Sequence, residues 1–522
     1  MQLVSYGAQD IYISGNPQIT FWKVLYKRHT NFAVESIEVT FNGQADFNKR
    51  VTAVINRNAD LMYKTYVQVV LPQIDLRTSA ASGTFSPGGG TSGFRWLNYI
   101  GHRLIKQVEV EIGGQRIDRQ YGDWMQIWTQ LSTDAGTVAA LDSIIGNTHD
   151  LVLMKRATGL GLDQTCAASE TTVSCVPRQG TPAKTLYIPL QFWFCRNPGL
   201  AIPLIALQYH EVRINVDFET WQNCSYYESA VGVPVSPVAQ SLAAASLYVD
   251  YVYLDTEERR RFAQQSHEYL IEQVQYTGAE SITSSSNKIQ LNFNHPVKEL
   301  FWVVQRDSFV DCSNPAWVAS VGGPQPFNYS DDFSSEGMVM SLLSQSTNTS
   351  NAGFLATANV SQATAVLGQG PTQLSSLIGA DSYDLSGTNE FESTVNYLLA
   401  KVILDSGIRC EGKNPVEVAK LQLNGQDRFT EREGAYFDRV QPYQHHSRTP
   451  STGVNVYSFA LRPEEHQPSG TCNFSRIDKA TLQLTVSINT VVGARTAQVR
   501  VYALNYNVLR VMSGMGGLAY SN

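Results

Sequence analysis

The sequence is poor in charge, in grouped cysteines and in long apolar runs. Only 16% of its 522 residues are charged. Its seven cysteines are widely spaced and form no Cys-x-x-Cys pair, so neither a zinc site nor a disulfide scaffold is indicated. No run approaches about 18 apolar residues, and Met1–Tyr6 lacks the basic start and apolar centre of a signal peptide. We expect a soluble chain with reduced thiols that does not follow the usual secretory route.

The charge that is present is slightly acidic and unevenly placed. The net charge is -7, whereas nucleic-acid binders need clustered Lys and Arg to track phosphates, so direct nucleic-acid binding is disfavoured. No Lys or Arg occurs from Asp311 to Ala400, and this stretch contains eight Asp and Glu residues. An acidic stretch rich in Ser, Thr and Asn is typical of a solvated loop, which we expect to face outward.

Abundant aromatic residues and regular alternation predict strands. The chain is 43% hydrophobic and contains 25 Tyr and 21 Phe, a composition that favours half-buried strands. Apolar residues recur with a period of two in eight segments, at Ile37–Phe41, Val108–Ile112, Leu186–Phe194, Val212–Phe218, Ile289–Phe293, Leu421–Leu423, Val454–Val456 and Leu482–Ile488. Helical spacing is rare, and its clearest case runs from Tyr121 to Leu131.

The two halves of the chain repeat one order of features. A length of 522 residues exceeds the roughly 250 to 300 at which single cores stop growing, so two domains are expected. The strand ending at Ile112 is followed by a Gly-Gln-Arg turn, and the strand ending at Leu423 by Asn-Gly-Gln-Asp-Arg. Each half closes with two further strands. We interpret this as a duplicated antiparallel β-domain, joined near Tyr253–Phe262 by a charged linker or short helix.

Other segments predict loops, turns and caps. Residues 78–93, 132–184 and 321–387 are expected to be long loop insertions. Asn424 and Gly425 predict a tight hairpin, and the Thr-x-x-Glu motif ending at Glu433 matches a capping box that predicts a helix start. The glycines between Ser513 and Leu518 lack a following Lys-Ser/Thr, so they predict a flexible tail instead of a phosphate loop.

No motif indicates catalysis or a cofactor. His210 and Glu211 begin like a zinc-peptidase helix, but Ile214 stands where the second His is needed. His445 and His446 are adjacent, so in a strand they would point to opposite faces. A glycosidase would need two carboxylates, and the 46 acidic residues do not single out a pair. We expect no enzymatic activity, no bound metal and no cofactor.

Five Asn-x-Ser/Thr sequences occur in the chain, and three of them lie in the acidic insertion, at Asn328, Asn348 and Asn359. Glycosylation at these three residues is a hypothesis. Cytosolic synthesis, which would bypass the secretory glycosylation machinery, argues against it, and an intact mass equal to that of the polypeptide would exclude it.

Three blocks of sequence resemble one protein family closely. The first, residues 6–32, includes Ser-Gly-Asn-Pro-Gln-Ile-Thr-Phe-Trp. The second, residues 423–475, includes Leu-Asn-Gly-Gln-Asp-Arg-Phe-Thr-Glu-Arg-Glu-Gly-Ala-Tyr-Phe and Leu-Arg-Pro-Glu-Glu-His. The third, residues 502–522, ends the chain with Met-Ser-Gly-Met-Gly-Gly-Leu-Ala-Tyr-Ser-Asn. These blocks resemble the major capsid proteins of the nucleocytoplasmic large double-stranded DNA viruses. The resemblance is weakest in the three insertions.

This resemblance implies an all-β fold of two consecutive eight-stranded antiparallel jelly rolls, a double jelly roll with long loop insertions and few short helices. It divides the chain into an N-terminal arm at 1–30, a first jelly roll at 31–255, a second at 256–510 and a C-terminal tail at 511–522. Three copies would form a homotrimer with a nearly hexagonal outline, because two similar domains per chain give six similar edges. Such capsomers tile a large icosahedral shell.

The resemblance also places the N-terminal arm at the base of the capsomer. There it would contact neighbouring capsomers, minor capsid and penton proteins, and an internal viral membrane. The expected arm residues are both apolar and basic: Phe21, Trp22, Lys23, Tyr26, Lys27 and Arg28. The protein would reside in the virion after assembly in the host cytoplasm.

Three alternatives remain open from the sequence. One is a minor or paralogous capsid protein of the same family, which its copy number per particle would reveal. Another is a β-sandwich carbohydrate-binding protein or enzyme, which would bind sugar as a single protomer. The third is a non-capsid β-sandwich scaffold, which would not form the trimer.

Overall fold

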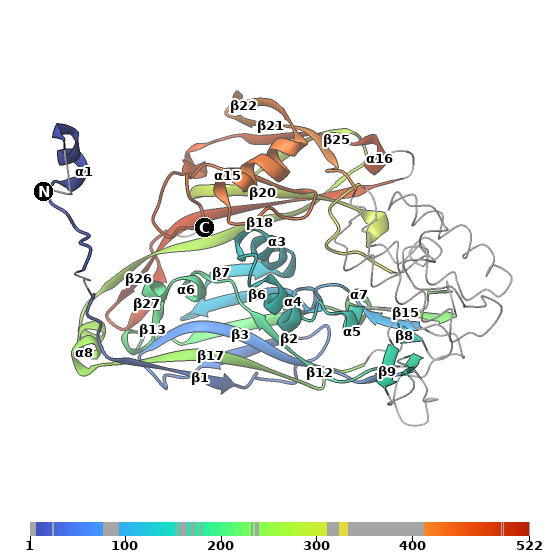
Figure 1. Ribbon diagram of the computed structural model, residues 1–522, viewed down its shortest axis with the longest axis horizontal. Helices are drawn as coiled ribbons and strands as arrows, with labels where there is room; N and C mark the ends of the chain where they lie inside the picture. The colour runs from blue at the N-terminus through green and yellow to red at the C-terminus, as the bar shows by residue number, and fades with distance from the viewer. Residues whose placement is uncertain are drawn as a thin grey trace, which may run out of the picture.

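The fold consists of two β-sandwiches that follow one another along the chain (Figure 1). The computed structural model describes residues 7–22, 26–76, 93–152, 155–156, 164–168, 173–177, 180–230, 233–234, 240–310, 323–331, 412–491, 493 and 495–520.

The first sandwich has two sheets of four principal strands each. One sheet has the order β1 (Phe32–Val39), β17 (Ala244–Leu254), β3 (Leu61–Leu71) and β12 (Lys184–Pro189). The other has the order β2 (Arg50–Ile55), β14 (Val212–Phe218), β6 (Ile105–Ile112) and β7 (Gln115–Tyr121). Their inward-facing side chains form one core because alternate residues of each strand point to the same face.

The second sandwich repeats this arrangement. Its first sheet has the order β18 (His267–Ile282), β26 (Ala497–Met512), β20 (Pro296–Arg306) and β23 (Val454–Ser458). Its second sheet has the order β19 (Ser286–Leu291), β25 (Ala480–Val486), β21 (Val416–Leu423) and β22 (Gln426–Glu433). A second core lies between these two sheets.

The strand order is the same in the two sandwiches when the eight principal strands of each are counted along the chain. In both, the first, eighth, third and sixth strands form one antiparallel sheet, and the second, seventh, fourth and fifth form the other. A further two-residue strand pairs with the third principal strand in each case, β13 (Ile202–Pro203) with β3 and β24 (Cys472–Asn473) with β20. The predicted double jelly roll is confirmed.

Shorter elements surround the two sandwiches. The remaining strands are β4 (Ile74–Asp75), β5 (Gly93–Trp96), β8 (Lys155–Arg156), β9 (Gln164–Ala168), β10 (Val173–Pro177), β11 (Gly180–Thr181), β15 (Ser225–Ala230), β16 (Val233–Pro234) and β27 (Met515–Leu518). The α-helices are α1 (Ile11–Ser14), α2 (Ile100–Leu104), α3 (Gly122–Ser132), α4 (Val138–Ile145), α5 (His149–Val152), α6 (Trp193–Arg196), α7 (Trp221–Cys224), α8 (Thr256–Gln264), α15 (Gln441–His445) and α16 (Ile488–Val491). Single helical turns are η1 (Ala8–Asp10), η2 (Pro198–Leu200), η3 (Leu204–Ala206), η4 (Asp307–Phe309), η7 (Phe474–Arg476) and the π-turn η6 (Tyr436–Val440).

Two of the sequence predictions about turns have opposite outcomes. Asn424 and Gly425 both have positive φ, 52° and 82°, and join β21 to β22 as the predicted tight hairpin. The glycine-rich end of the chain also folds: Ser513 and Gly514 make a similar turn, and β27 pairs with β26. The prediction of a flexible tail is therefore wrong, because paired backbone groups hold these glycines in a strand.

Two other predictions of local structure are corrected. The strand expected at Leu186–Phe194 ends at Pro189, and α6 follows; proline has no N–H with which to continue the ladder. The capping-box motif that ends at Glu433 lies within β22, where pairing with Val418 in β21 satisfies the backbone. The helix there begins only at Gly434.

The predicted insertions are only partly described. Within 132–184, α4 packs onto the first sandwich, with Ile145 buried against Gly101, so this part is not a loop. Of the acidic insertion, residues 323–331 are described, and Phe327 and Tyr329 are buried. Most of 78–93 and of 321–387 lies outside the described residues, as does the expected outward placement of the acidic stretch.

The predicted helix at Tyr121–Leu131 is confirmed as α3. Its equivalent in the second sandwich is the helical segment 434–445, since each follows the fifth principal strand. Both begin at a glycine packed against backbone. A Cβ at Gly122 would lie 2.2 Å from the carbonyl oxygen of His102, and one at Gly434 would lie 1.8 Å from that of Val416.

We predict that Gly122→Ala or Gly434→Ala destabilises the protein by more than about 2 kcal/mol, because backbone must move to admit the methyl group. The matched control is Gly136→Ala, whose Cβ would meet nothing within 4 Å. This control should change the free energy of unfolding by less than about 0.5 kcal/mol. Denaturant unfolding of the three variants measures the differences, and equal stability of all three would contradict the equivalence of the two helix starts.

Candidate assembly surfaces

Helix α3 joins the two sandwiches (Figure 1). It belongs to the first sandwich, but its outward side chains pack on the sheet of the second that contains β20 and β26. The Trp124 ring lies 5.0 Å from the ring of Phe301 and 5.9 Å from that of Tyr502, measured between centroids. Trp128 stacks on Trp124 and is also buried. Burial of large aromatic side chains is the main stabilising contribution here.

A group of buried charges lies beside these aromatic rings. Glu272 of β18 accepts hydrogen bonds from Arg196 at 2.9 Å and from Lys298 at 2.5 Å. Lys298 is fully buried, and this burial lowers the pKa of its amine, while Glu272 opposes the effect. The Arg196 guanidinium lies over the ring of Trp128 at 4.2 Å. The first sandwich thus supplies a cation to a carboxylate of the second.

A buried carboxyl group makes another link between the sandwiches. Asp118 of β7 accepts a hydrogen bond from the backbone N–H of Val274 in β18, at 3.0 Å. The side-chain amide of Gln273 donates to the carbonyl of Ile117. Burial raises the pKa of Asp118 to about 7, against the lowering effect of hydrogen bonds from the backbone N–H groups of Val274 and Arg119 and from the Gln120 amide, and of the Arg196 charge. The β7–β18 contact is therefore polar as well as apolar.

His446 is held between two carboxylates. Its Nε2 lies 2.7 Å from Glu299 and its Nδ1 lies 2.9 Å from Glu464. Burial lowers the pKa of the imidazole, but the two carboxylates outweigh it, and the net pKa is raised to about 9. The ring faces that of Trp128 at 6.3 Å. The structure places the adjacent His445 elsewhere, with its Nδ1 at 3.1 Å from the carbonyl oxygen of Leu461.

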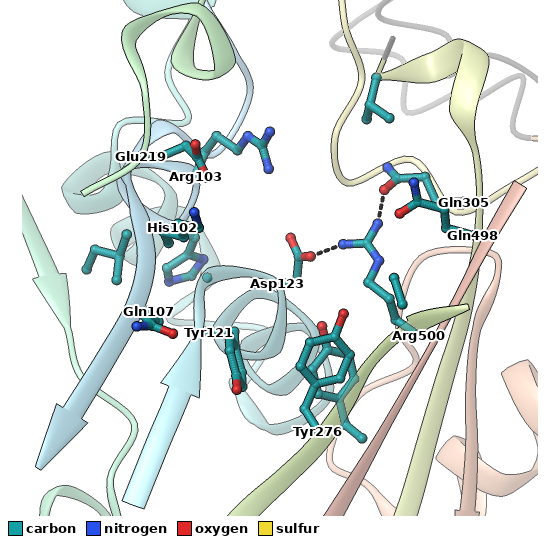
Figure 2. Close-up of a pocket in the computed structure, with 16 residues that line it drawn as sticks. His102, Arg103, Gln107, Tyr121, Asp123, Glu219, Tyr276, Gln305, Gln498 and Arg500 are labelled. Carbon is teal, nitrogen blue, oxygen red and sulfur yellow. Dashed lines mark hydrogen bonds and ion pairs between the residues drawn. The ribbon is translucent and has the colours of Figure 1, made fainter. Parts of the chain in front are cut away.

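A cavity of about 370 Å³ opens between the two sandwiches (Figure 2). Asp123 of α3 and Arg500 of β26 meet across it, and Arg500 also donates to Gln305. His102 lines the wall on the side of the first sandwich, and burial lowers its pKa to about 4, so the ring is neutral at pH 7. The Asp123–Arg500 ion pair makes this cavity part of the junction between the sandwiches.

The N-terminal arm extends away from the sandwiches before it enters β1 (Figure 1). Of the arm residues predicted from the sequence, Phe21, Trp22 and Tyr26 are 102%, 82% and 87% exposed, and Lys27 and Arg28 are also exposed. The sixth, Lys23, lies outside the described residues. These exposed aromatic side chains make the arm a candidate interaction segment.

The predicted glycosylation sites are only partly described. Asn328 is half-buried, and its amide nitrogen, the atom to which a sugar would be attached, donates to Gln325 at 2.7 Å. Its carbonyl oxygen accepts from the N–H and the hydroxyl of Ser330. Asn348 and Asn359 lie outside the described residues.

In the part of the chain that the structure describes, no group of three His, Cys, Asp or Glu residues could hold a metal ion. No helix in the same ranges has both the length and the apolar character to span a bilayer.

The buried charges of the junction were missed in the sequence, although a signal exists. The segment Val297–Arg306 is buried at every position, and it includes Lys298 and Glu299. In a strand that is buried on one face, buried and exposed residues alternate. The residues of β20 do not alternate in this way, because α3 covers the second face of its sheet. A charged pair inside a continuous apolar strand therefore indicates a paired, buried site.

We predict that His446 stabilises the protein below pH 6.5 and that this contribution is lost as pH rises to about 9, because its folded-state pKa is raised above the unfolded value. The difference in free energy of unfolding between the wild type and His446→Gln should shrink by up to about 1.4 kcal/mol per pH unit in this window. Denaturant unfolding from pH 6 to 10 measures it, with the partly exposed His466→Gln as control. A pH-independent difference would contradict the charged pairing.

Comparisons with known proteins agree with this architecture. A family sequence model described as "Large eukaryotic DNA virus major capsid protein" matches residues 258–517, and one described as "Major capsid protein N-terminus" matches residues 20–255. The chain is 55% identical over 534 residues to the major capsid protein of Phaeocystis pouchetii virus, and the alignment covers 100% of this chain and 99% of that relative.

A second relative and a solved structure show the same likeness. The major capsid protein of Chrysochromulina ericina virus is 52% identical over 583 residues, with 100% of this chain and 99% of that protein covered. A chain in a quasi-atomic model of the PBCV-1 virus capsid superposes with a TM-score of 0.60 at 31% identity, and the alignment covers 96% of this chain and 100% of that one. Together with the repeated strand order, these matches show that the chain belongs to the major capsid protein family of large eukaryotic DNA viruses.

Proposed function

We propose that three copies of this chain form a capsomer, the repeating unit from which the icosahedral capsid of a large DNA virus is built. Membership of the family gives the chain a structural role in the virion capsid, where it assembles with other copies of itself. The observation that carries the trimer is the duplication: one chain contains two sandwiches with the same strand order. Three such chains present six similar domains in a nearly hexagonal ring.

The chain divides into functional regions on this proposal. Residues 31–255 and 256–510 are the two jelly rolls that form the ring, with α8 at their junction. Residues 1–30 are the arm that reaches from the base to neighbouring capsomers, to minor capsid and penton proteins, and to the internal membrane. Residues 511–522 are the C-terminal tail, in which Gly514 contacts Tyr209 of the first sandwich. Assembly takes place in the host cytoplasm, without direct nucleic-acid contact and without enzymatic activity.

Glycosylation of Asn348 and Asn359 is a separate proposal. The hydrogen bonds of the Asn328 amide argue against that residue as a third site. Intact mass spectrometry of virion protein decides it: added hexose masses support the proposal, and a mass equal to the polypeptide removes it.

We predict a stable native mass of about 173 kDa, three times the 57.8 kDa of one chain. Light scattering coupled to size-exclusion chromatography measures it, and negative-stain images should show hexagonal outlines. A monomer of 57.8 kDa that remains monomeric at high concentration would contradict the capsomer.

We predict that removal of residues 1–30 leaves the trimer intact but abolishes its association into larger species, because the exposed aromatic side chains of the arm are lost. Sedimentation velocity at increasing concentration measures both effects. A double variant, Phe21→Ser with Trp22→Ser, should reproduce the effect in the full chain. Dissociation of the truncated protein to monomers would instead assign the arm to the trimer itself.

A further inference from the structure

The two sandwiches are alike, yet one equivalent face is covered in the second and open in the first. In the second sandwich, α3 covers the outer face of the sheet that contains β20 and β26. In the first sandwich, the equivalent sheet contains β3 and β17. Figure 1 shows this sheet on the side of the first sandwich turned away from the second. Among the residues that the structure describes, no helix packs on this face as α3 packs on its equivalent.

Strand register identifies the equivalent residues of the two faces. In β3, Leu61 and Met62 pair with β13, as Pro296 and Val297 of β20 pair with β24. Counting onward from these anchors places Tyr66 at the position of Phe301. Tyr66 pairs with Tyr248, and Phe301 pairs with Tyr502. The side chains on which Trp124 packs thus have counterparts in Tyr66 and Tyr248.

These counterparts form a cluster of rings, here called the tyrosine face: Tyr66, Tyr187 and Tyr248. The rings of Tyr66 and Tyr248 are stacked with centroids 5.4 Å apart, and Tyr187 meets Tyr66 edge-on at 6.0 Å. The hydroxyl of Tyr66 lies 3.0 Å from that of Ser36 in β1. Tyr187 is 40% exposed, and the other two are partly exposed. Tyrosine combines apolar area with a polar tip, which suits a surface that is wet before association and buried afterwards.

The helical segment 434–445 of the second sandwich presents the matching partner surface. Counting from the equivalent glycines Gly122 and Gly434, Met125 corresponds to Phe437, and each is fully buried in its own core. At the same distances from these glycines as Ile127, Trp128 and Leu131 of α3 stand Arg439, Val440 and Tyr443, here called the helix face; the π-turn η6 turns them relative to their counterparts in α3. Val440 is 39% exposed and Tyr443 is 83% exposed. This outward side therefore lacks the covered environment of α3.

The charges of the two surfaces are complementary. Arg439 stands where α3 has an isoleucine. Its guanidinium lies 3.9 Å from the Asp438 carboxylate and donates to Pro450 and Thr452, and its side chain is 45% exposed. Beside the tyrosine face, Glu38 of β1 pairs with Tyr248, and Asp250 pairs with Ser36. Lys64, two residues before Tyr66 in β3, is an exposed amine. The Tyr248 hydroxyl donates to Glu38 at 3.5 Å. An arginine among aromatic residues is a common composition at the centre of protein interfaces.

We propose that the helix face of one copy of this chain docks on the tyrosine face of the next copy. The contact repeats between chains what α3 does within one chain. It is a head-to-tail contact, because each copy offers a helix face to one neighbour and a tyrosine face to the other, and such contacts close into rings. This contact rests on the proposed trimer and identifies the surfaces that hold it together.

The first experiment places a charge on each surface in turn. The helix-face variant is Val440→Asp with Tyr443→Asp, both at exposed positions that are not part of a core. The sheet variant is Tyr66→Asp with Tyr248→Asp. Each purified variant is expected to lose the 173 kDa species and to run near 57.8 kDa, with an unchanged far-UV circular dichroism spectrum. The matched control, Ile488→Asp in α16, alters a 65% exposed residue away from both surfaces and is expected to remain trimeric.

The second experiment mixes the two variants. The sheet variant retains an intact helix face, and the helix-face variant retains an intact tyrosine face, so one good contact can form between them but a ring cannot close. The mixture is therefore expected to give a heterodimer of about 116 kDa, twice 57.8 kDa, measured by light scattering. A self-complementary contact between like faces would give no such heterodimer.

The outcomes separate this inference from the proposed function. A helix-face variant that remains a 173 kDa trimer overturns the docking contact and leaves the capsomer standing. Monomeric wild-type protein removes the trimer itself. The helix-face residues are exposed, so the helix-face variant is expected to fold even if the sheet variant misfolds. A helix-face variant that still formed trimers would therefore overturn the inference whatever the result for the sheet variant. A mixture that stays monomeric, with both variants folded, would also overturn it.

Discussion

The packing of α3 on the second sandwich is the contact on which the rest of the structure depends. Trp124 and Trp128 bury their rings against a sheet whose other face already belongs to a core. That sheet is consequently apolar on both sides, and the two sandwiches are held in one fixed relation. The relative position of the two sandwiches determines which of their surfaces remain exposed and can contact other molecules. The open face of the first sandwich and the open helix of the second are consequences of this one contact.

Burial on both sides has an electrostatic consequence for β20. Lys298 and Glu299 lie near the start of the strand and are fully buried, and an isolated charge there would cost several kcal/mol. Each is matched by a residue from another element: Glu272 receives the lysine, and His446 receives the glutamate. These pairs add little net stability compared with apolar residues of equal size. They do require one particular alignment of strands and helices, since any other leaves a charge unpaired.

The sequence alone predicted local features of this structure, such as strands and a hairpin, but it did not predict contacts between distant segments. Alternation located the half-buried strands, and Asn424–Gly425 located a hairpin, because both depend on near neighbours. The jelly-roll order came from resemblance, since periodicity does not specify which strands pair. The capping motif ending at Glu433 failed because pairing with β21 outweighed a local preference. The charges of β20 were missed because their partners are distant in the sequence.

The C-terminal hairpin also depends on contacts between residues that are far apart in the sequence. The hairpin that carries β27 reaches back to the first sandwich, where the N–H of Tyr209 donates to the carbonyl of Gly514 at 2.9 Å and the N–H of Leu518 to Gln115 at 3.2 Å. Gly516 lies against Leu207 and Ile112. The chain must be synthesised through Leu518 before these contacts can form. A prematurely terminated chain consequently lacks them, and the first sandwich exposes the apolar surface that β27 would cover.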